Sequence, residues 1–156
     1  MDVECDGVVG HLRHRRSLRS IQETCRNLKI NHVCQGHCCC LAMGGVLDRL
    51  PDLRIGLAHG GGAFPFTIGR IGHGHAVRPD LCAIDSETAP ADLLDRFVYD
   101  SLVHDAAALR FLVDRVGVER VALGSDYPFP LGEDRPGPLI EDSNLSIQAK
   151  ERLLSG

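Results

Sequence analysis

Two polar residues in this chain each follow a short apolar run and could bind a metal ion or transfer a proton. His59 comes directly after the run 54–58 and is followed by the glycines 60–62. Asp126 comes shortly after the run 121–123. Zinc accepts carboxylate oxygens and imidazole nitrogens, and an imidazole beside such a metal can act as a general base. The pair therefore indicates a metal-assisted site.

Each of these residues also has an ordinary structural interpretation. A histidine at a turn is often hydrogen-bonded only to the backbone, and an aspartate before Tyr127-Pro128 can act as a helix cap or form an Asx turn. However, a carboxylate buried at a strand end is costly unless it is paired or bound to a metal. The glycines after His59 would leave room for a substrate and expose backbone N–H groups. The residues alone leave both interpretations open.

The elements around these residues are expected to alternate between strands and helices. A buried parallel strand is expected over 54–58, and further strands over 97–100 and 121–123. Helices are expected over 41–50 (ended by Pro51), 64–77, 106–116 and from Ser146 onward, with a polar loop over 80–92. This order predicts a parallel α/β sheet. In a barrel of such strands, the residues at the strand ends face one shared mouth.

The motifs from about Met43 to Gly156 resemble the C-terminal part of a known enzyme family. They comprise 44–49, 57–67, 69–71, 78–82, 102–105 and 123–133. The segment is similar to the 2-amino-3-carboxymuconate-6-semialdehyde decarboxylases, zinc enzymes of the amidohydrolase superfamily. The resemblance implies an α/β fold, the last three or so strand–helix units of a partial (β/α)8 TIM-type barrel. The chain's 156 residues are fewer than the roughly 250 of a complete barrel.

The resemblance also implies a reaction and roles for three residues. The reaction is zinc-dependent, non-oxidative decarboxylation of 2-amino-3-carboxymuconate 6-semialdehyde in tryptophan–kynurenine catabolism, which diverts flux away from quinolinate. Asp126 would bind the metal, and His59 would be the acid/base beside it. Arg70 would bind a carboxylate of the substrate in the neighbouring subunit of a homodimer, because a guanidinium forms two parallel hydrogen bonds with a carboxylate. The alternative is that Arg70 is an ordinary surface arginine without a role in substrate binding.

The chain departs from the family pattern before residue 41. It has no His-x-His pair on an upstream strand, and His11, His14, His32 and His37 do not stand in a matching context. We therefore expect an incomplete and inactive fragment with doubtful zinc binding. The alternatives are a non-catalytic fragment that pairs with full-length subunits through the Arg70 helix, or another hydrolase or decarboxylase of the amidohydrolase family.

Residues 1–40 are expected to be an unmatched, poorly structured segment, and 41–156 the part of the barrel. A weak helical pattern spans 17–28. A Cys/His-rich stretch, residues 32–40, could in principle bind zinc, but three adjacent cysteines cannot all turn toward one ion from regular backbone. Free thiols are expected for the seven cysteines.

Composition excludes several classes of function. A net charge of −4 argues against a general affinity for nucleic acid, and no apolar run is long enough to span a membrane. The start of the chain has no secretory signal pattern, which favours the cytosol. Of the remaining histidines, His104 is expected to lie near the site or cap a helix, and His73 and His75 to be structural.

Overall fold

The computed structural model describes residues 41–155. The expected segment 1–40, its weak helix and its Cys/His-rich stretch lie outside this range. The described residues divide into two compact units: 41–53 with 66–93, and 54–65 with 94–155. His59 and Asp126 belong to the second unit, and Arg70 belongs to the first. No helix in the described range is long and apolar enough to cross a membrane.

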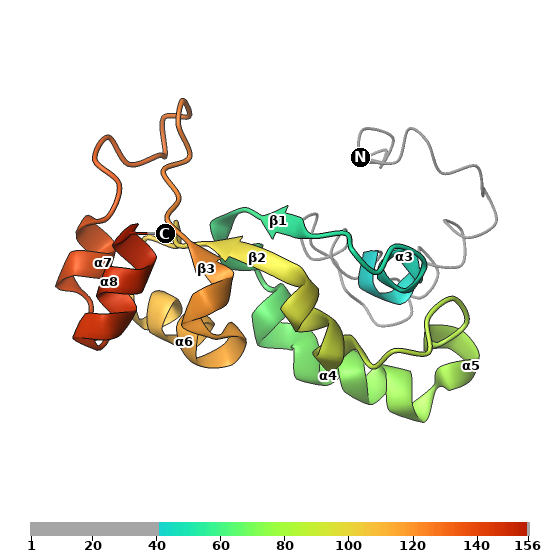
Figure 1. The fold of residues 1–156 in the computed structure, drawn as a ribbon. Coiled ribbons are helices and arrows are strands. Elements are labelled where there is room, and N and C mark those ends of the chain that lie inside the picture. Colours follow the sequence, from blue (N-terminus) through green and yellow to red (C-terminus); the bar gives the residue numbers. More distant parts are fainter. Residues whose placement is uncertain (1–40, 156) are drawn as a thin grey trace. The chain divides into compact units, whose positions relative to one another are not determined.

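The second unit is built on a parallel sheet of three short strands (Figure 1). These are β1 (Ile55–Leu57), β2 (Phe97–Asp100) and β3 (Val121–Ala122), and β2 lies between the other two. Leu57 pairs with Tyr99 on one side of β2, and Asp100 pairs with Ala122 on the other. The predicted parallel α/β fold is therefore confirmed, and the carboxyl ends of all three strands lie along one edge of the sheet.

Aromatic side chains on one face of β2 form the core of this unit. Phe97 and Tyr99 are buried while Val98 and Asp100 are half-buried, the alternation expected of a strand. The ring of Phe97 packs edge-to-face on that of Phe64, with 5.4 Å between centroids. The Tyr99 hydroxyl donates to the carbonyl oxygen of Leu94 at 3.3 Å, so its polar atom is satisfied within the core.

Three helices complete the second unit. In α6 (Ala106–Val116), the Asp105 side chain caps the start, and the buried residues Leu109, Leu112 and Val116 share one face. Figure 1 shows α7 (Pro138–Asp142) and α8 (Ile147–Ser155) beside each other, near α6. The helices predicted over 106–116 and from Ser146 are confirmed. The short helix α7 was not predicted, because Pro138 is a loop signal that also suits the first position of a helix.

The first unit contains most of α4 (Phe64–Val77), whose predicted bounds are confirmed, and the short helices α3 (Val46–Arg49) and α5 (Pro79–Cys82). The continuous helix predicted over 41–50 is wrong, because Gly44 and Gly45 form a turn within it. Gly45 has a left-handed φ of 64°, and a Cβ there would lie 2.0 Å from the carbonyl oxygen of Asp85.

Two further expectations need correction. The polar loop predicted over 80–92 includes most of α5, which begins at Pro79 and is stabilised by two hydrogen bonds from Arg78 to Asp80. The side-chain hydrogen bond from Arg78 lowers the pKa of the Asp80 carboxyl. The strand predicted over 54–58 is shorter, and its residues are half-buried or exposed, because within the described residues β1 has only β2 as a neighbour.

Candidate active site

The clearest feature of the site is a repeated backbone conformation at the carboxyl ends of the strands. His59, His104 and Asp126 have φ values of 54°, 51° and 54°, and each follows one of β1, β2 and β3 by two to four residues. No other non-glycine residue in the described range has a positive φ. Such left-handed backbone costs a side-chain-bearing residue about 1–3 kcal/mol and is concentrated at functional sites. The strained backbone therefore occurs at both predicted site residues of this sheet, His59 and Asp126. It also occurs at a third residue, His104.

The sequence suggested that the glycine loop after His59 exposes free N–H groups. In the structure, each of these N–H groups is hydrogen-bonded. The N–H of Gly61 donates to Ala58, that of Gly62 donates to His59, and that of Gly60 donates to the Asp100 carboxylate. The glycines are needed for space instead. A Cβ at Gly60 would lie 2.7 Å from the side chain of Val103, and one at Gly61 would lie 2.9 Å from the ring of Tyr99.

His59 itself is exposed, beside this closely packed loop. Its side chain makes no hydrogen bond or ion pair with any residue in the range 41–155. The alternative interpretation, a core histidine hydrogen-bonded at a turn, is therefore not what the described residues show. The imidazole is free to meet a substrate or a metal-bound group.

Asp126 lies in a tight loop that its own carbonyl oxygen helps to close. That oxygen accepts from Phe129 at 2.8 Å, and the carbonyl oxygen of Ser125 accepts from Glu133 at 2.8 Å. A Cβ at Gly132 would lie 2.4 Å from the Ser125 carbonyl oxygen, so only glycine allows this approach. The loop therefore fixes the backbone of Asp126 from both directions.

The Asp126 carboxylate is half-buried rather than buried, because β3 ends at Ala122 and leaves Leu123 outside the sheet. Its carboxylate therefore loses less hydration than the sequence predicted. An Asx turn is impossible, since the residue two positions on is Pro128, which has no N–H. No helix begins at Asp126 either, and its carboxylate accepts no hydrogen bond from the described residues. It remains available as a ligand.

His104 lies at the end of β2 and faces the loop that carries Asp126. Its Nδ1 is 4.0 Å from Oε1 of Glu133, and the other oxygen of that carboxylate accepts from the N–H of Gly137 at 3.2 Å. The cap of α6 is the next residue, Asp105, whose carboxylate accepts from Ala108 at 2.7 Å. His104 is therefore not a helix cap. It is a third polar group at the carboxyl edge of the sheet.

The loop between Asp126 and Glu133 also exposes large apolar side chains. Tyr127, Phe129 and Leu131 are 86%, 66% and 80% exposed. Tyr127 and Phe129 border an open cavity of about 520 Å³ together with Ser125, Glu133 and neighbouring residues of the loop. The loop therefore presents an apolar surface with a few polar groups, which is the usual composition of a small-molecule site.

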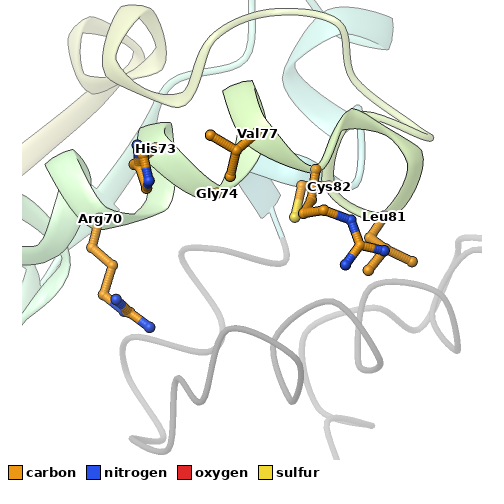
Figure 2. Close-up of a pocket in the computed structure, with 7 residues that line it drawn as sticks. Arg70, His73, Gly74, Val77, Leu81 and Cys82 are labelled. Carbon is orange, nitrogen blue, oxygen red and sulfur yellow. The ribbon is translucent and has the colours of Figure 1, made fainter.

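Arg70 lies in the other unit, on the helix α4 as predicted. Its exposed side chain makes no hydrogen bond or ion pair with residues 41–155, and it borders a cavity of about 210 Å³ with His73, Gly74, Val77 and α5 (Figure 2). His73 and His75 form a His-x-His pair, but on a helix. His75 Nε2 is 3.2 Å from the carbonyl oxygen of Ser86, which is a structural contact.

The described residues alone do not form a complete metal site. Among residues 41–155, no group of three or more His, Cys, Asp and Glu side chains is close enough to hold an ion. His59 and Asp126 follow strands that are two positions apart, which corresponds to a strand separation of about 10 Å. The edge of the sheet offers the carboxylate of Asp126 and the imidazoles of His59 and His104, and further ligands would have to come from outside the described range.

Two residues of this edge were missed or undervalued from the sequence. In the sequence, only its position at a strand end distinguishes Asp100, the last residue of β2. In the structure, its carboxylate accepts a hydrogen bond from the loop of His59. His104 was expected only as context. Asp100 ends β2 and His104 follows it by four residues, so a search of every strand end for polar side chains would have found them.

Comparisons with known proteins agree with this architecture. A family model described as Amidohydrolase matches residues 6–156. The chain is 55% identical over 119 residues to 2-amino-3-carboxymuconate-6-semialdehyde decarboxylase of Dictyostelium discoideum, covering 76% of this chain and 33% of that protein. It is 47% identical over 117 residues to the enzyme of the same name from Caenorhabditis elegans, covering 74% and 29%. The chain thus spans about a third of the length of these relatives.

Two solved structures share the fold. One is 5-carboxyvanillate decarboxylase from Sphingomonas paucimobilis, with a TM-score of 0.64 and 23% identity, over 85% of this chain and 43% of that protein. The other is dihydroxybenzoic acid decarboxylase from Polaromonas, with bound manganese and an inhibitor, at a TM-score of 0.63 and 21% identity over 75% and 36%. The partial barrel expected from the sequence is confirmed by these matches.

Proposed function

Because the chain belongs to the amidohydrolase family, we propose that it is part of a metal-dependent decarboxylase that acts on a small unsaturated carboxylic acid. The substrate we propose is 2-amino-3-carboxymuconate 6-semialdehyde, which places the reaction in tryptophan–kynurenine catabolism. Support comes from the two relatives of that name at 55% and 47% identity. The observation that carries the proposal is the left-handed backbone of His59 and Asp126 at two strand ends of one parallel sheet.

Asp126 is the proposed metal ligand. Its carboxylate is half-buried and unpaired among the described residues, and the loop around it fixes its backbone. Zinc is the proposed metal, and it would supply Lewis-acid chemistry when bound. The described residues do not complete its coordination, so the other ligands belong to parts of the protein outside 41–155.

His59 is the proposed acid/base. It is exposed, makes no competing hydrogen bond within the described range, and stands on a loop whose N–H groups are already satisfied. Its imidazole can therefore exchange a proton with a substrate at the edge of the sheet. Such proton transfer contributes about 10²–10⁴-fold to a rate.

Arg70 is the proposed substrate-binding residue, and it would act in a homodimer. Its guanidinium has no partner among the described residues, and it borders a cavity on α4. A free guanidinium can bind a carboxylate through two parallel hydrogen bonds. We propose that it reaches the carboxylate of a substrate held by the neighbouring subunit.

A chimera tests the proposed function. Residues 43–156 would replace the matching segment of the Dictyostelium relative, and release of carbon dioxide from 2-amino-3-carboxymuconate 6-semialdehyde would be measured. We expect turnover, and loss of both metal and turnover with Asp126→Ala. A folded, metal-loaded chimera without turnover would exclude this substrate. It would favour the alternative, a segment that pairs with full-length subunits without catalysing the reaction.

A further inference from the structure

The side chain of Asp100 lies between the loops that follow the three strands. Asp100 is the last residue of the central strand β2. Its Oδ1 accepts from the backbone N–H of Gly60, in the loop after β1, at 3.0 Å, and from the N–H of Leu102, in its own loop, at 3.2 Å. Its other face lies against Gly124, in the loop after β3.

The contact with Gly124 is close enough to exclude a side chain there. A Cβ on Gly124 would lie 2.8 Å from the Cβ of Asp100 and 3.2 Å from its Oδ2. The adjacent Ser101 adds one bond to the end of β3 and one to the loop that follows it. Its N–H donates to Ala122 at 2.9 Å, and its hydroxyl oxygen accepts from the N–H of Gly124 at 3.3 Å. The end of β2 is therefore joined to both neighbouring loops.

The bond to Gly60 acts directly on His59. The N–H of Gly60 belongs to the same planar peptide as the carbonyl of His59, so fixing that N–H fixes the backbone dihedral ψ of His59. Gly60 is buried, and a buried N–H that loses its acceptor is costly. The Asp100 carboxylate thus compensates for the strained backbone that presents His59.

We propose that Asp100 is a positioning residue, which holds His59 in its left-handed conformation and sets its place relative to the loop of Asp126. That this geometry serves catalysis rests on the proposed function. The hydrogen bond and the packing of Asp100 are observed independently of that function. In this arrangement Asp100 needs only an acceptor oxygen at Oδ1, which accepts both backbone hydrogen bonds. An asparagine, which keeps that acceptor oxygen, should therefore replace it.

Amide hydrogen exchange on the 156-residue chain, followed by NMR, tests the proposal without metal or substrate. With Asp100→Ala, we expect exchange at the Gly60 amide to become about tenfold faster or more, because one hydrogen bond is lost. Asp100→Asn should keep Gly60 exchange within about threefold of the unsubstituted chain. The amide of Leu109, which donates to Asp105 in α6, should not change in either variant.

A second variant moves the carboxylate without removing it. Gly124→Ala places a methyl group against Asp100 and should also speed exchange at Gly60. Gly56→Ala is the matched control, because a Cβ there meets no atom within 4 Å, and it should leave Gly60 unchanged. Unchanged exchange at Gly60 in both Asp100→Ala and Gly124→Ala would overturn the proposal. So would equal acceleration at Leu109, since Asp100 would then support the whole fold rather than the loop. The chimera assay can fail without affecting either result.

Discussion

His59 and Asp126 share the same left-handed backbone angle, a φ of 54°, although they follow different strands of the sheet. The two strands lie on either side of β2, and the carboxylate of Asp100 at the end of β2 is bonded to the loop of His59 and packed against the loop of Asp126. His104, which follows β2, has a φ of 51° as well, so left-handed backbone recurs at the ends of all three strands. This recurrence is explained if the three residues serve one site at this edge.

This strain predicts an unusual order of stability for substitutions at residue 126. Glycine adopts a positive φ at little cost, whereas alanine does not. The Asp126→Gly variant should therefore be more stable than the Asp126→Ala variant. Urea denaturation should give a free energy of unfolding that is about 1 kcal/mol higher for the glycine variant. His73 in the helix α4 is the control, because there the order must reverse, with glycine about 1 kcal/mol less stable than alanine. The same order at both positions would contradict the strain.

The glycine loop should be intolerant of even one methyl group at residue 61. In Gly61→Ala, the added Cβ would lie 2.9 Å from the ring of Tyr99. The alanine would also have to adopt the backbone φ of 75° that glycine has at this position. Strain and overpacking together should lower the free energy of unfolding by about 2–4 kcal/mol. Gly69→Ala, where a Cβ meets nothing within 4 Å in the helix α4, should instead raise it by about 0.5–1 kcal/mol. Thermal unfolding of both variants checks the contrast.

The cap of α6 gives a third prediction. Asp105→Ala removes the acceptor for the N–H of Ala108 and should lower the free energy of unfolding by about 1 kcal/mol. Asp105→Ser keeps a capping oxygen and should recover most of this loss. Asp114→Ala removes only an exposed ion pair with Arg110 and should cost about 0.5 kcal/mol or less. If Asp114→Ala cost as much as Asp105→Ala, general surface charge rather than capping would explain both results.

Metal analysis of the purified chain is expected to find less than one tightly held zinc ion per chain after dialysis. The described residues hold no cluster of three potential ligands, and stable zinc sites in proteins use three or four. Any zinc that remains should depend on Asp126. Zinc that survives Asp126→Ala but is lost when Cys38, Cys39 and Cys40 are replaced would show that the Cys/His-rich stretch binds it.

A mixing experiment in the active chimera tests whether Arg70 serves a neighbouring subunit. Arg70→Ala should raise KM, whereas His59→Ala should lower kcat by about 10²–10⁴-fold and keep the metal. Mixed dimers of the two variants should regain activity, because one site then contains both intact residues. No recovery after confirmed mixing would mean that Arg70 does not act across the dimer.

Much of the fold follows from local patterns in the sequence. The bounds of α4, β2 and α6 agree with their predicted ranges. The pattern is clearest in α6, whose apolar residues share one face and whose ends are marked by Asp105 before it and Gly117 after it. The short helices α5 and α7 were not predicted, because each begins at a proline, which signals a loop and a helix start equally well. The motifs around His59 and Asp126 also sufficed to indicate the family.

The tertiary structure decided what surrounds those residues. The sequence suggested free N–H groups after His59. Within the folded loop, those of Gly61 and Gly62 donate to the carbonyls of Ala58 and His59, and the packing of β2 brings Asp100 within reach of that of Gly60. Similarly, only the folded loop shows that Asp126 is half-buried and left-handed, and that His104 faces Glu133. A motif specifies which side chains are present at a strand end. The contacts that join the three strand ends, from Gly60 to Asp100 and from Gly124 to Ser101, span 40 and 23 residues of the chain, so the pairing of the strands determines them.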